Sequence, residues 1–244
     1  MTTTKNREAL QSLYPFLHNK KSDIGRMKTA LLDSINRKVD QHRIVIDTFY
    51  TQNGEAMVGC AQAIAATYRA DGRLFAMGNG GSSSDASHIA VEFLHPVTTG
   101  RPALAAYDLT ADKTLITALS NDVGFDHVFA RQVANLARPG DCLIGISTSG
   151  NSTNIVSAFE VARKQNVTTI GLAGGDGGTM AAMGLDHCLV APSDSIHRIQ
   201  ECHVTIYHVL WDLVHTLLAD DRGNLGKASS PGANTHLGKA SKKE

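Results

Sequence analysis

Apolar positions in the first third of the chain recur every three or four residues, which is the period of one helical face. The pattern runs through Met27, Leu31, Ile35, Val39, His42, Ile46 and Phe49 and then, after Gly54, through Met57, Val58, Ala61, Ile64, Ala65 and Tyr68. Gly54 is expected to interrupt the helix, and Asp71-Gly72 is a turn signal. The pattern predicts a helical extension over residues 1–72, whose apolar face needs a partner surface in its own domain or in another subunit.

From residue 73 the pattern changes to short apolar runs separated by segments of helical period. The runs are LFAMG (74–78), ALAAYDL (103–109), CLIGIS (142–147), TTIGLAG (168–174) and HCLVAP (187–192). Apolar strands that alternate with helices, such as the one expected at 154–165, are typical of a parallel sheet with helices on both faces. The sequence therefore predicts an α/β fold with five parallel strands over residues 73–220, ending in a helix from Ile199 to Leu218.

The last part of the chain, residues 221–244, is small and polar, and it contains LGKAS twice, at 225–229 and 237–241. This composition cannot offset the entropy of ordering the chain, so a disordered tail is expected. A recognition tag is the alternative interpretation of the duplication, because two copies are too few for a solenoid.

Charge and composition narrow the class of protein. The chain has 23 basic and 23 acidic residues, and because the tail is basic, residues 1–220 carry a net charge of −3, which disfavours capture of nucleic acid. No run of 18 apolar residues predicts a membrane span, and the N-terminus lacks the pattern of a secretion signal. The four cysteines form no CxxC pair, so we expect a cytoplasmic protein without a disulfide framework.

The strand-to-helix turns are where ligands bind in an open α/β sheet. The first turn, GNGGSSSD from Gly78 to Asp85, offers glycines that let backbone N–H groups approach an anion, with Ser and Asp expected to cap the next helix. It has no GK[ST] and does not fit GxGxxG. Taken alone, an ordinary tight turn with a serine cap explains it equally well.

The second turn carries a stronger signal. Four hydroxyls, those of Ser147, Thr148, Ser149 and Ser152, stand with Gly150 at the start of the helix expected at 154–165. Neutral donors at the positive end of a helix dipole suit a phosphate monoester, and the absence of a nearby lysine argues against hydrolysis of nucleotide polyphosphates. The third turn, Gly174 to Gly178, is equally consistent with a purely structural role.

Two pairs of polar residues stand at helical spacing. His88 and Glu92 are four apart and share one face, while Gln200 and His208 are eight apart on the last helix, about 12 Å of rise and about 80° of rotation. Both pairs could border one pocket. A surface contact explains the first pair equally well, and a hydrogen-bonded core histidine explains His208.

Four motifs, GNGGSSSDASH, LSNDVGFDHVF, GISTSGNSTN and RIQECH, occur in this order, and with them residues 35–220 resemble the sugar-isomerase (SIS) domain family. Within that family the chain is most similar to the phosphoheptose isomerases, which act on sedoheptulose 7-phosphate. The resemblance implies a flavodoxin-like sheet and a homotetramer with active sites at subunit interfaces. It implies contacts to the sugar phosphate from Asn79, Gly80, Gly81, Ser82, Asn121, Asp122 and Gln200, and to the phosphate itself from Ser147, Thr148, Ser149 and Ser152.

The resemblance also implies that Glu92 is the general base and His208 the general acid, and that His88, Glu92, Gln200 and His208 bind zinc, as in some family members. These residue types suit aldose–ketose isomerisation, in which a carboxylate carries a proton between C1 and C2 of an enediolate while a histidine shuttles one between O1 and O2. For zinc, two histidines and a carboxylate are a reasonable set, whereas glutamine is an uncommon ligand and the spacing is not HExxH.

Two departures from the family pattern leave alternatives open. His95-Pro96-Val97 replaces a Thr-Gly-basic segment, the linker to Arg101-Pro102 is short, and His197 stands where an acidic residue is common. Because the family uses these positions for distal sugar hydroxyls, one alternative is an isomerase for another phosphosugar. A second alternative is a non-catalytic tetrameric binding protein, of the kind that associates with the bacterial replication initiator, although that class should lack Glu92 and His208.

Overall fold

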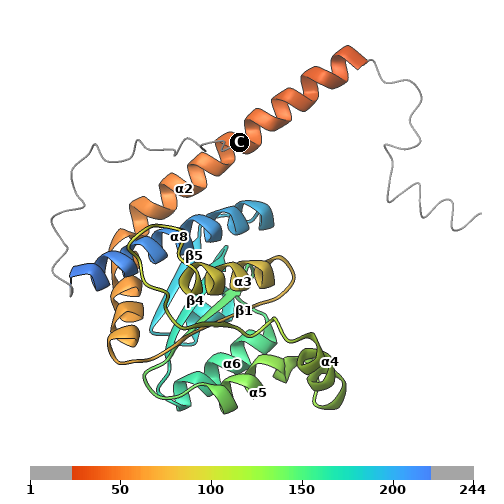
Figure 1. Ribbon diagram of the computed structural model, residues 1–244. Helices are drawn as coiled ribbons and strands as arrows, with labels where there is room; N and C mark the ends of the chain where they lie inside the picture. The colour runs from red at the N-terminus through yellow and green to blue at the C-terminus, as the bar shows by residue number, and fades with distance from the viewer. Residues whose placement is uncertain (1–23, 221–244) are drawn as a thin grey trace, which may run out of the picture. The chain divides into compact units, whose positions relative to one another are not determined.

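The computed structural model describes residues 24–220, and it contains the predicted parallel sheet (Figure 1). Its strands are β1 (Leu74–Gly78), β2 (Ala106–Asp108), β3 (Cys142–Ser147), β4 (Thr168–Gly174) and β5 (His187–Ala191). All neighbours pair in parallel in the order β2-β1-β3-β4-β5, which is the flavodoxin-like order and confirms the expected fold class. The second run is strand only at 106–108, where it forms the edge and pairs with β1 alone.

The helices alternate with these strands, as predicted. They are α2 (Ile24–Arg69), α3 (Gly81–Leu94), α4 (Lys113–Asp122), α5 (Val128–Leu136), α6 (Thr153–Lys164), α7 (Gly178–Ala182) and α8 (Ile196–Asp220), with a short 3-10 helix η2 (Phe125–His127) before α5. The helix expected at 154–165 is α6, and the one expected at 199–218 is α8, which begins three residues earlier.

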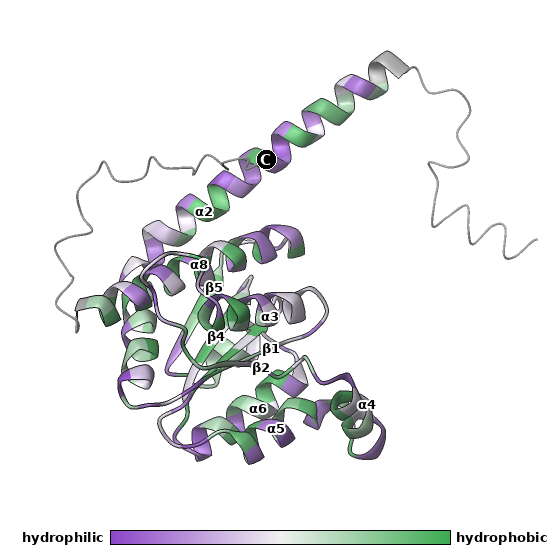
Figure 2. Cartoon of the chain, viewed as in Figure 1, coloured by the Kyte–Doolittle hydropathy of each residue, from purple (hydrophilic) through white to green (hydrophobic). Residues whose placement is uncertain are grey.

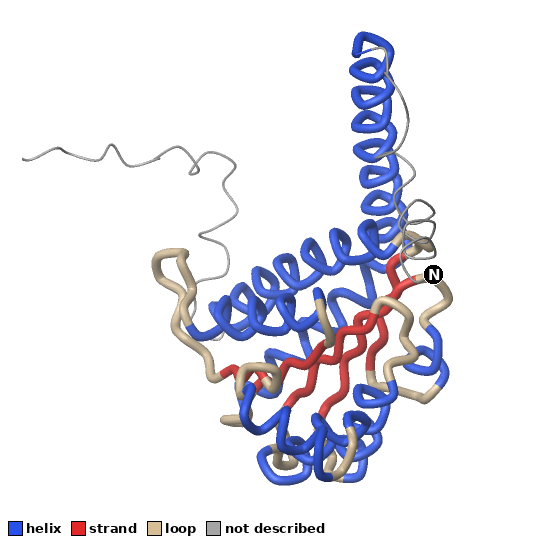
Figure 3. Tube along the Cα trace, turned by 90° about the vertical axis from the view of Figure 1, so that its right-hand side faces the viewer, coloured by secondary structure: helices blue, strands red, loops and turns tan. Residues whose placement is uncertain are grey.

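Helices cover the sheet on both faces, and Figure 3 shows these layers edge-on. Because successive side chains of a strand point to opposite faces, Ile144 packs with α3, α8 and residues 45–65 of α2, whereas Leu143 packs with α5, α6 and α7. The strands β1 and β3 are buried along their whole length, which is why they are almost entirely apolar. In Figure 2 the surrounding helices carry both hydrophilic and hydrophobic residues, as amphipathic helices do.

The predicted interruption at Gly54 is wrong, because α2 continues through it as one helix of 46 residues. A glycine inside a helix costs about 1 kcal/mol relative to alanine, which burial of Phe49 and Met57 on either side can offset. The chain divides into two compact units between Ile44 and Val45. Residues 1–23 of the predicted extension and the predicted tail at 221–244 lie outside the described residues.

None of the helices between residues 24 and 220 combines the length and the apolar character that crossing a membrane requires. The order of the strands also locates the place where a ligand fits. The strand order changes direction between β1 and β3, and in open α/β sheets ligands are expected at the carboxyl ends of the strands near such a point.

Candidate active site

The two helices that follow β1 and β3 both begin without a side-chain cap. Gly80 is the N-cap residue of α3 and has φ 56°, and Ser152 is the N-cap residue of α6; neither makes a side-chain capping hydrogen bond. The prediction that Ser and Asp cap α3 is therefore wrong, and the hydroxyl of Ser83 instead donates to the carbonyl oxygen of Gly80 at 2.6 Å. Helix N-termini whose N–H groups lack side-chain partners favour an anion.

A pair of asparagines joins these two helix starts. The amide of Asn79, in the first turn, donates to the side-chain oxygen of Asn154 at 2.9 Å, and Asn154 donates back to Asn79 at 3.0 Å. Asn154 is buried at the beginning of α6. The side chain of Asn79 is thus committed to holding the first and second turns together, a role that the sequence analysis did not assign to either residue.

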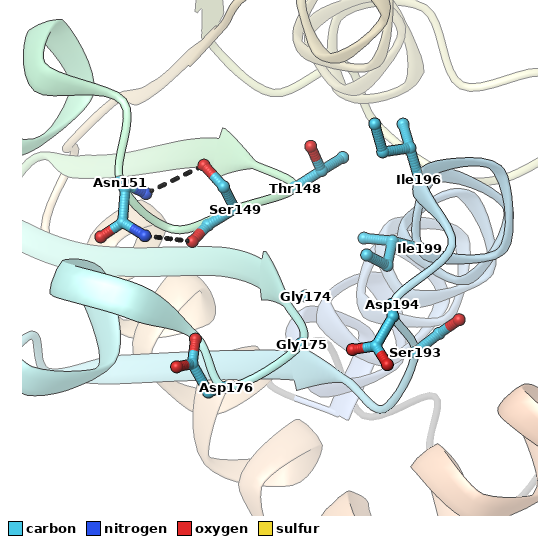
Figure 4. A pocket seen from close by; sticks show the side chains of 10 residues that line it. All are labelled: Thr148, Ser149, Asn151, Gly174, Gly175, Asp176, Ser193, Asp194, Ile196 and Ile199. Carbon is cyan, nitrogen blue, oxygen red and sulfur yellow. Dashed lines mark hydrogen bonds between the residues drawn. The ribbon is translucent and has the colours of Figure 1, made fainter.

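Two of the four hydroxyl residues of the second turn, Thr148 and Ser149, line a pocket of about 500 Å³, whereas Ser147 and Ser152 are not part of its lining. Ser147 is buried at the end of β3, and its Oγ lies 2.9 Å from the Oγ of Ser152. Thr148 and Ser149 line the pocket, and the Oγ of Ser149 accepts from the backbone N–H of Asn151 at 3.2 Å. The complete lining, drawn in Figure 4, is Thr148, Ser149, Asn151, Gly174, Gly175, Asp176, Ser193, Asp194, Ile196 and Ile199.

The third turn packs directly on the second. A Cβ at Gly150, which has φ 65°, would lie 1.9 Å from the carbonyl oxygen of Gly177, so only glycine allows this approach. The side-chain oxygen of Asn151 accepts from both the N–H and the hydroxyl of Thr179, at 2.9 and 2.8 Å. The third turn, whose role the sequence left open, therefore forms part of the pocket wall through Gly175 and Asp176.

Three ionisable side chains gather where α3 and α8 meet. His88 and Glu92 lie one turn apart on α3, with Nε2 of His88 at 3.1 Å from Oε1 of Glu92. His208 of α8 completes the group: its ring centroid is 5.0 Å from that of His88, and one potential ligand atom from each of the three residues lies within 4.8 Å of the others. Two imidazoles and a carboxylate at this separation suit a zinc ion.

Gln200 lies at the other end of α3. A Cβ at Gly81 would lie 2.3 Å from the side-chain nitrogen of Gln200, so the glutamine amide rests against the first residue of the helix. Gln200 therefore contacts the first residue of α3, and His208 lies beside His88 in the middle of the same helix. The first turn and the ionisable cluster are thus linked by one pair of packed helices.

Two polar aromatic residues of α8 surround the cluster, and the sequence analysis identified neither. The hydroxyl of Tyr207 lies 2.8 Å from Nδ1 of His88, and the indole N–H of Trp211 donates to the backbone carbonyl of Glu92 at 2.8 Å. Burial raises the pKa of Tyr207, which keeps the phenol neutral. Burial also raises the pKa of the nearby Asp85 to about 6, an effect that His88 reduces.

Other predicted residues are not brought to the pocket within the described chain. Asn121 and Asp122 end α4, where both are exposed and the Asn121 amide donates to the Asp122 carboxylate at 2.8 Å. The departures from the family pattern, His95 and His197, are also exposed. Conversely, Ser193 and Asp194 line the pocket but were not predicted, although they directly follow β5, at the edge of the sheet where ligands are expected.

Comparisons with known proteins identify the same family that the four sequence motifs resemble. The model of the SIS domain family matches residues 39–174. A phosphoheptose isomerase of Roseiflexus sp. (strain RS-1) is 41% identical over 191 residues, covering 78% of this chain and 94% of that protein. Solved phosphoheptose isomerases resemble the chain too: that of Neisseria gonorrhoeae has a TM-score of 0.65 at 38% identity, covering 79% of this chain and 98% of its own. That of Francisella tularensis has a TM-score of 0.67 at 34% identity, with coverage of 80% and 99%.

Proposed function

The chain belongs to the SIS domain family and, within it, to the phosphoheptose isomerases, and from this premise we propose that it converts sedoheptulose 7-phosphate to D-glycero-D-manno-heptose 7-phosphate. The observation that carries the proposal is the pairing of two uncapped, hydroxyl-rich helix starts with the cluster of His88, Glu92 and His208. The first arrangement suits a phosphate and the second suits proton transfer. The non-catalytic alternative gains no support, since this acid–base pair is present.

In the proposed reaction Glu92 is the base. Its carboxylate takes the proton from C1 of the ketose and returns it to C2, while His208 moves a proton between O1 and O2 of the enediolate. The contact between Glu92 and His88 supports this role, because it holds the carboxylate in one orientation. A positioned acid or base of this kind contributes about 10²–10⁴-fold in rate.

We assign the phosphate to the second turn. Ser147, Thr148, Ser149 and Ser152 supply hydroxyls, and the start of α6 supplies backbone N–H groups at the positive end of its dipole. The first turn, with Asn79, Gly80, Gly81 and Ser82, contacts the rest of the sugar phosphate together with Gln200. Binding the phosphate far from the reacting carbons orients the chain of the sugar over the base.

We propose zinc as the cofactor, held by His88, Glu92, His208 and Gln200. The mutual distances of the first three side chains fit such an ion. When bound, zinc supplies a Lewis acid that polarises the sugar carbonyl. The residues themselves perform the proton transfers described above.

A homotetramer with active sites between subunits is part of the proposal. Exposed apolar residues on the first half of α2, among them Leu31, Ile35 and Val39, support it, because such a stripe on one helix suits burial against other helices. The exposure of Asn121 and Asp122 supports it as well, since a residue that contacts the sugar needs a pocket wall opposite. We assign residues 73–220 to the sugar-phosphate domain, and the four free cysteines support a cytoplasmic location.

A panel of ketose phosphates with five to seven carbons tests the substrate. Turnover is followed by a coupled assay for the aldose product, and in D₂O by NMR of the C1 and C2 hydrogens. We expect the highest kcat/KM for sedoheptulose 7-phosphate, with deuterium entering C2 of the product. A preference for a shorter sugar would instead favour the other-phosphosugar alternative, for which the exposed His95 and His197 are the first residues to exchange. Absence of turnover with every sugar would refute the proposal.

A further inference from the structure

Two helices face each other in the candidate site with matched spacing. On α3, His88 and Glu92 are four residues apart; on α8, Tyr207 and Trp211 are four residues apart as well. Tyr207 contacts the side chain of His88, and Trp211 donates to the backbone of Glu92, both at 2.8 Å. One turn of α8 therefore contacts one turn of α3 at both His88, a proposed zinc ligand, and Glu92, the proposed base.

We propose that Tyr207 is a positioning residue that holds the His88 ring through Nδ1, so that Nε2 faces Glu92, and that Trp211 fixes the helix at Glu92. The inference deepens the proposed function and rests on it for the activity measurements alone. The binding of zinc and the protonation of the ring can be measured without any substrate.

The argument starts from the two nitrogens of His88, since a neutral imidazole has one N–H and one lone pair. Nδ1 lies 2.8 Å from the Tyr207 hydroxyl and Nε2 lies 3.1 Å from the Glu92 carboxylate. If Nε2 carries the proton, it donates to Glu92, and the phenol must donate to Nδ1. If Nε2 offers its lone pair to a cation, Nδ1 carries the proton and the phenol must accept it. A hydroxyl can do both, whereas a carboxylate or carbonyl partner would impose the second state.

Two aromatic rings of α8 lie against the partly exposed ring of His88. Its centroid lies 5.4 Å from that of Tyr207, at an interplanar angle of 79°, and Tyr207 in turn lies 4.7 Å from His208. Tyr207 itself is only 3% exposed, so its hydroxyl is fixed by packing. The phenol is thus a preorganised partner for His88, of the kind that orients metal-ligating histidines in proteins.

The indole of Trp211 is also held in place, by a cation over its ring. The guanidinium of Arg101 lies 4.4 Å from the centre of the indole and also pairs with Asp212 at 2.5 Å. The indole is therefore sandwiched between Arg101 and the end of α3, with its N–H directed at the carbonyl of Glu92.

The test compares Tyr207→Phe with Tyr68→Phe. Each variant loses one hydroxyl from a tyrosine in the same core cluster, but the Tyr68 hydroxyl donates to the backbone carbonyl of Ala105 at 3.3 Å, not to His88. Zinc affinity is measured by competition with a chelator, and the state of the His88 ring by ¹⁵N NMR, with His88→Gln identifying its signals. Circular dichroism and thermal unfolding establish that the variants are folded.

We expect Tyr207→Phe to weaken zinc binding by about 10–100-fold, the usual effect of removing a partner behind a metal ligand, and Tyr68→Phe to leave it unchanged. In the metal-free protein, the ¹⁵N signal of His88 Nδ1 should shift in Tyr207→Phe, because this nitrogen loses its hydrogen-bond partner, and should stay unchanged in Tyr68→Phe. Trp211→Phe should keep zinc affinity but lower kcat by about fivefold, the effect of one hydrogen bond.

An unchanged zinc affinity and an unchanged His88 spectrum in Tyr207→Phe would refute the proposal. Equal losses in Tyr207→Phe and Tyr68→Phe would refute it too, because they would indicate a general effect of packing. If the wild type binds no zinc, the NMR comparison alone decides. A wild type that turns over no sugar would refute the proposed function and leave both of these measurements valid.

Discussion

The two halves of the candidate site are built in different ways. The proposed phosphate half centres on the second turn, where uncharged hydroxyls and amides lie close together in the sequence, and the third turn adds Asp176 to the pocket wall. The ionisable half consists of His88, Glu92 and His208, which come from two helices that are more than a hundred residues apart. The first half depends on local backbone geometry, and the second depends on how α3 packs against α8.

This difference suggests that one half contributes mainly to substrate binding and the other mainly to the reaction rate. The hydroxyls and amides of the second turn can bind a dianion without titrating themselves, so we expect their contribution to be to affinity and orientation. A cluster of imidazoles and a carboxylate changes its protonation during the reaction, so its contribution is to the rate. Variants of the two halves should therefore separate kcat from KM, and the following predictions test that separation, from the largest expected effect to the smallest.

Glu92→Gln should lower kcat by about 10²–10⁴-fold, because the amide cannot accept the C1 proton. Its KM should stay within a few-fold of the wild-type value, since the phosphate half is untouched. Steady-state kinetics with the coupled assay gives both constants, and calorimetry with inorganic phosphate checks the binding site. Glu160→Gln, on the exposed surface of α6, is the matched control and should change neither constant. A rise in KM as large as the fall in kcat would contradict the division.

His203 ties the helix of the ionisable half to the sheet. It is fully buried on α8, and its Nε2 lies 2.9 Å from the carbonyl oxygen of Ala173 in β4. Burial lowers the pKa of this imidazole from 6.5 to about 4, so the unfolded chain takes up its proton at a higher pH than the folded chain does. The stability that His203 contributes is complete above pH 6.5 and is lost as the pH falls towards 4, about 3 kcal/mol in total.

The free energy of unfolding should fall between pH 7 and pH 4 in the wild type, and in His203→Gln this fall should be smaller by about 3 kcal/mol. Urea unfolding at a series of pH values measures it. His197→Gln, on the exposed side of the same helix, is the control and should keep the wild-type slope. An identical slope in the His203 variant would mean that this histidine is not held neutral, and that α8 is anchored by other contacts.

Ser152→Ala should produce the smallest of these effects. Loss of one hydroxyl that donates to a charged phosphate weakens binding by about 10–100-fold in KM, with kcat nearly unchanged. Ser157→Ala, one turn further along α6, should behave like the wild type. The same kinetic assay measures both, and a fall in kcat without a change in KM would mean that the second turn belongs to the catalytic half.

Three of the five strands could be predicted from the sequence to the residue, because strands buried on both faces form short, mostly apolar runs, whereas the edge run at 103–109 is strand only at 106–108. The runs at 74–78, 142–147 and 168–174 are strands over their whole length. Glycines were harder to interpret. Gly54 looked like a break but lies on the exposed side of a helix that burial elsewhere sustains, and Gly80 took the N-cap position that serine was expected to fill.

The candidate site was predictable only where it is local. The four hydroxyls of residues 147–152 can be recognised because they lie within six residues of one another. Tyr207 and Trp211, in contrast, look like two more apolar residues in the helical pattern of α8. The Tyr207 hydroxyl and the Trp211 N–H form hydrogen bonds to residues of α3, and the periodicity of α8 alone does not predict which helix packs against it. The hydrogen bonds between Asn79 and Asn154, which are 75 residues apart, could not be predicted for the same reason.

That asparagine pair has a consequence for how the enzyme responds to its surroundings. Two amides that bond to each other neither gain nor lose a proton over the whole range in which cells live, and added salt does not weaken them as it weakens an ion pair. The connection between the first and second turns should therefore keep its form while acidity and ionic strength vary.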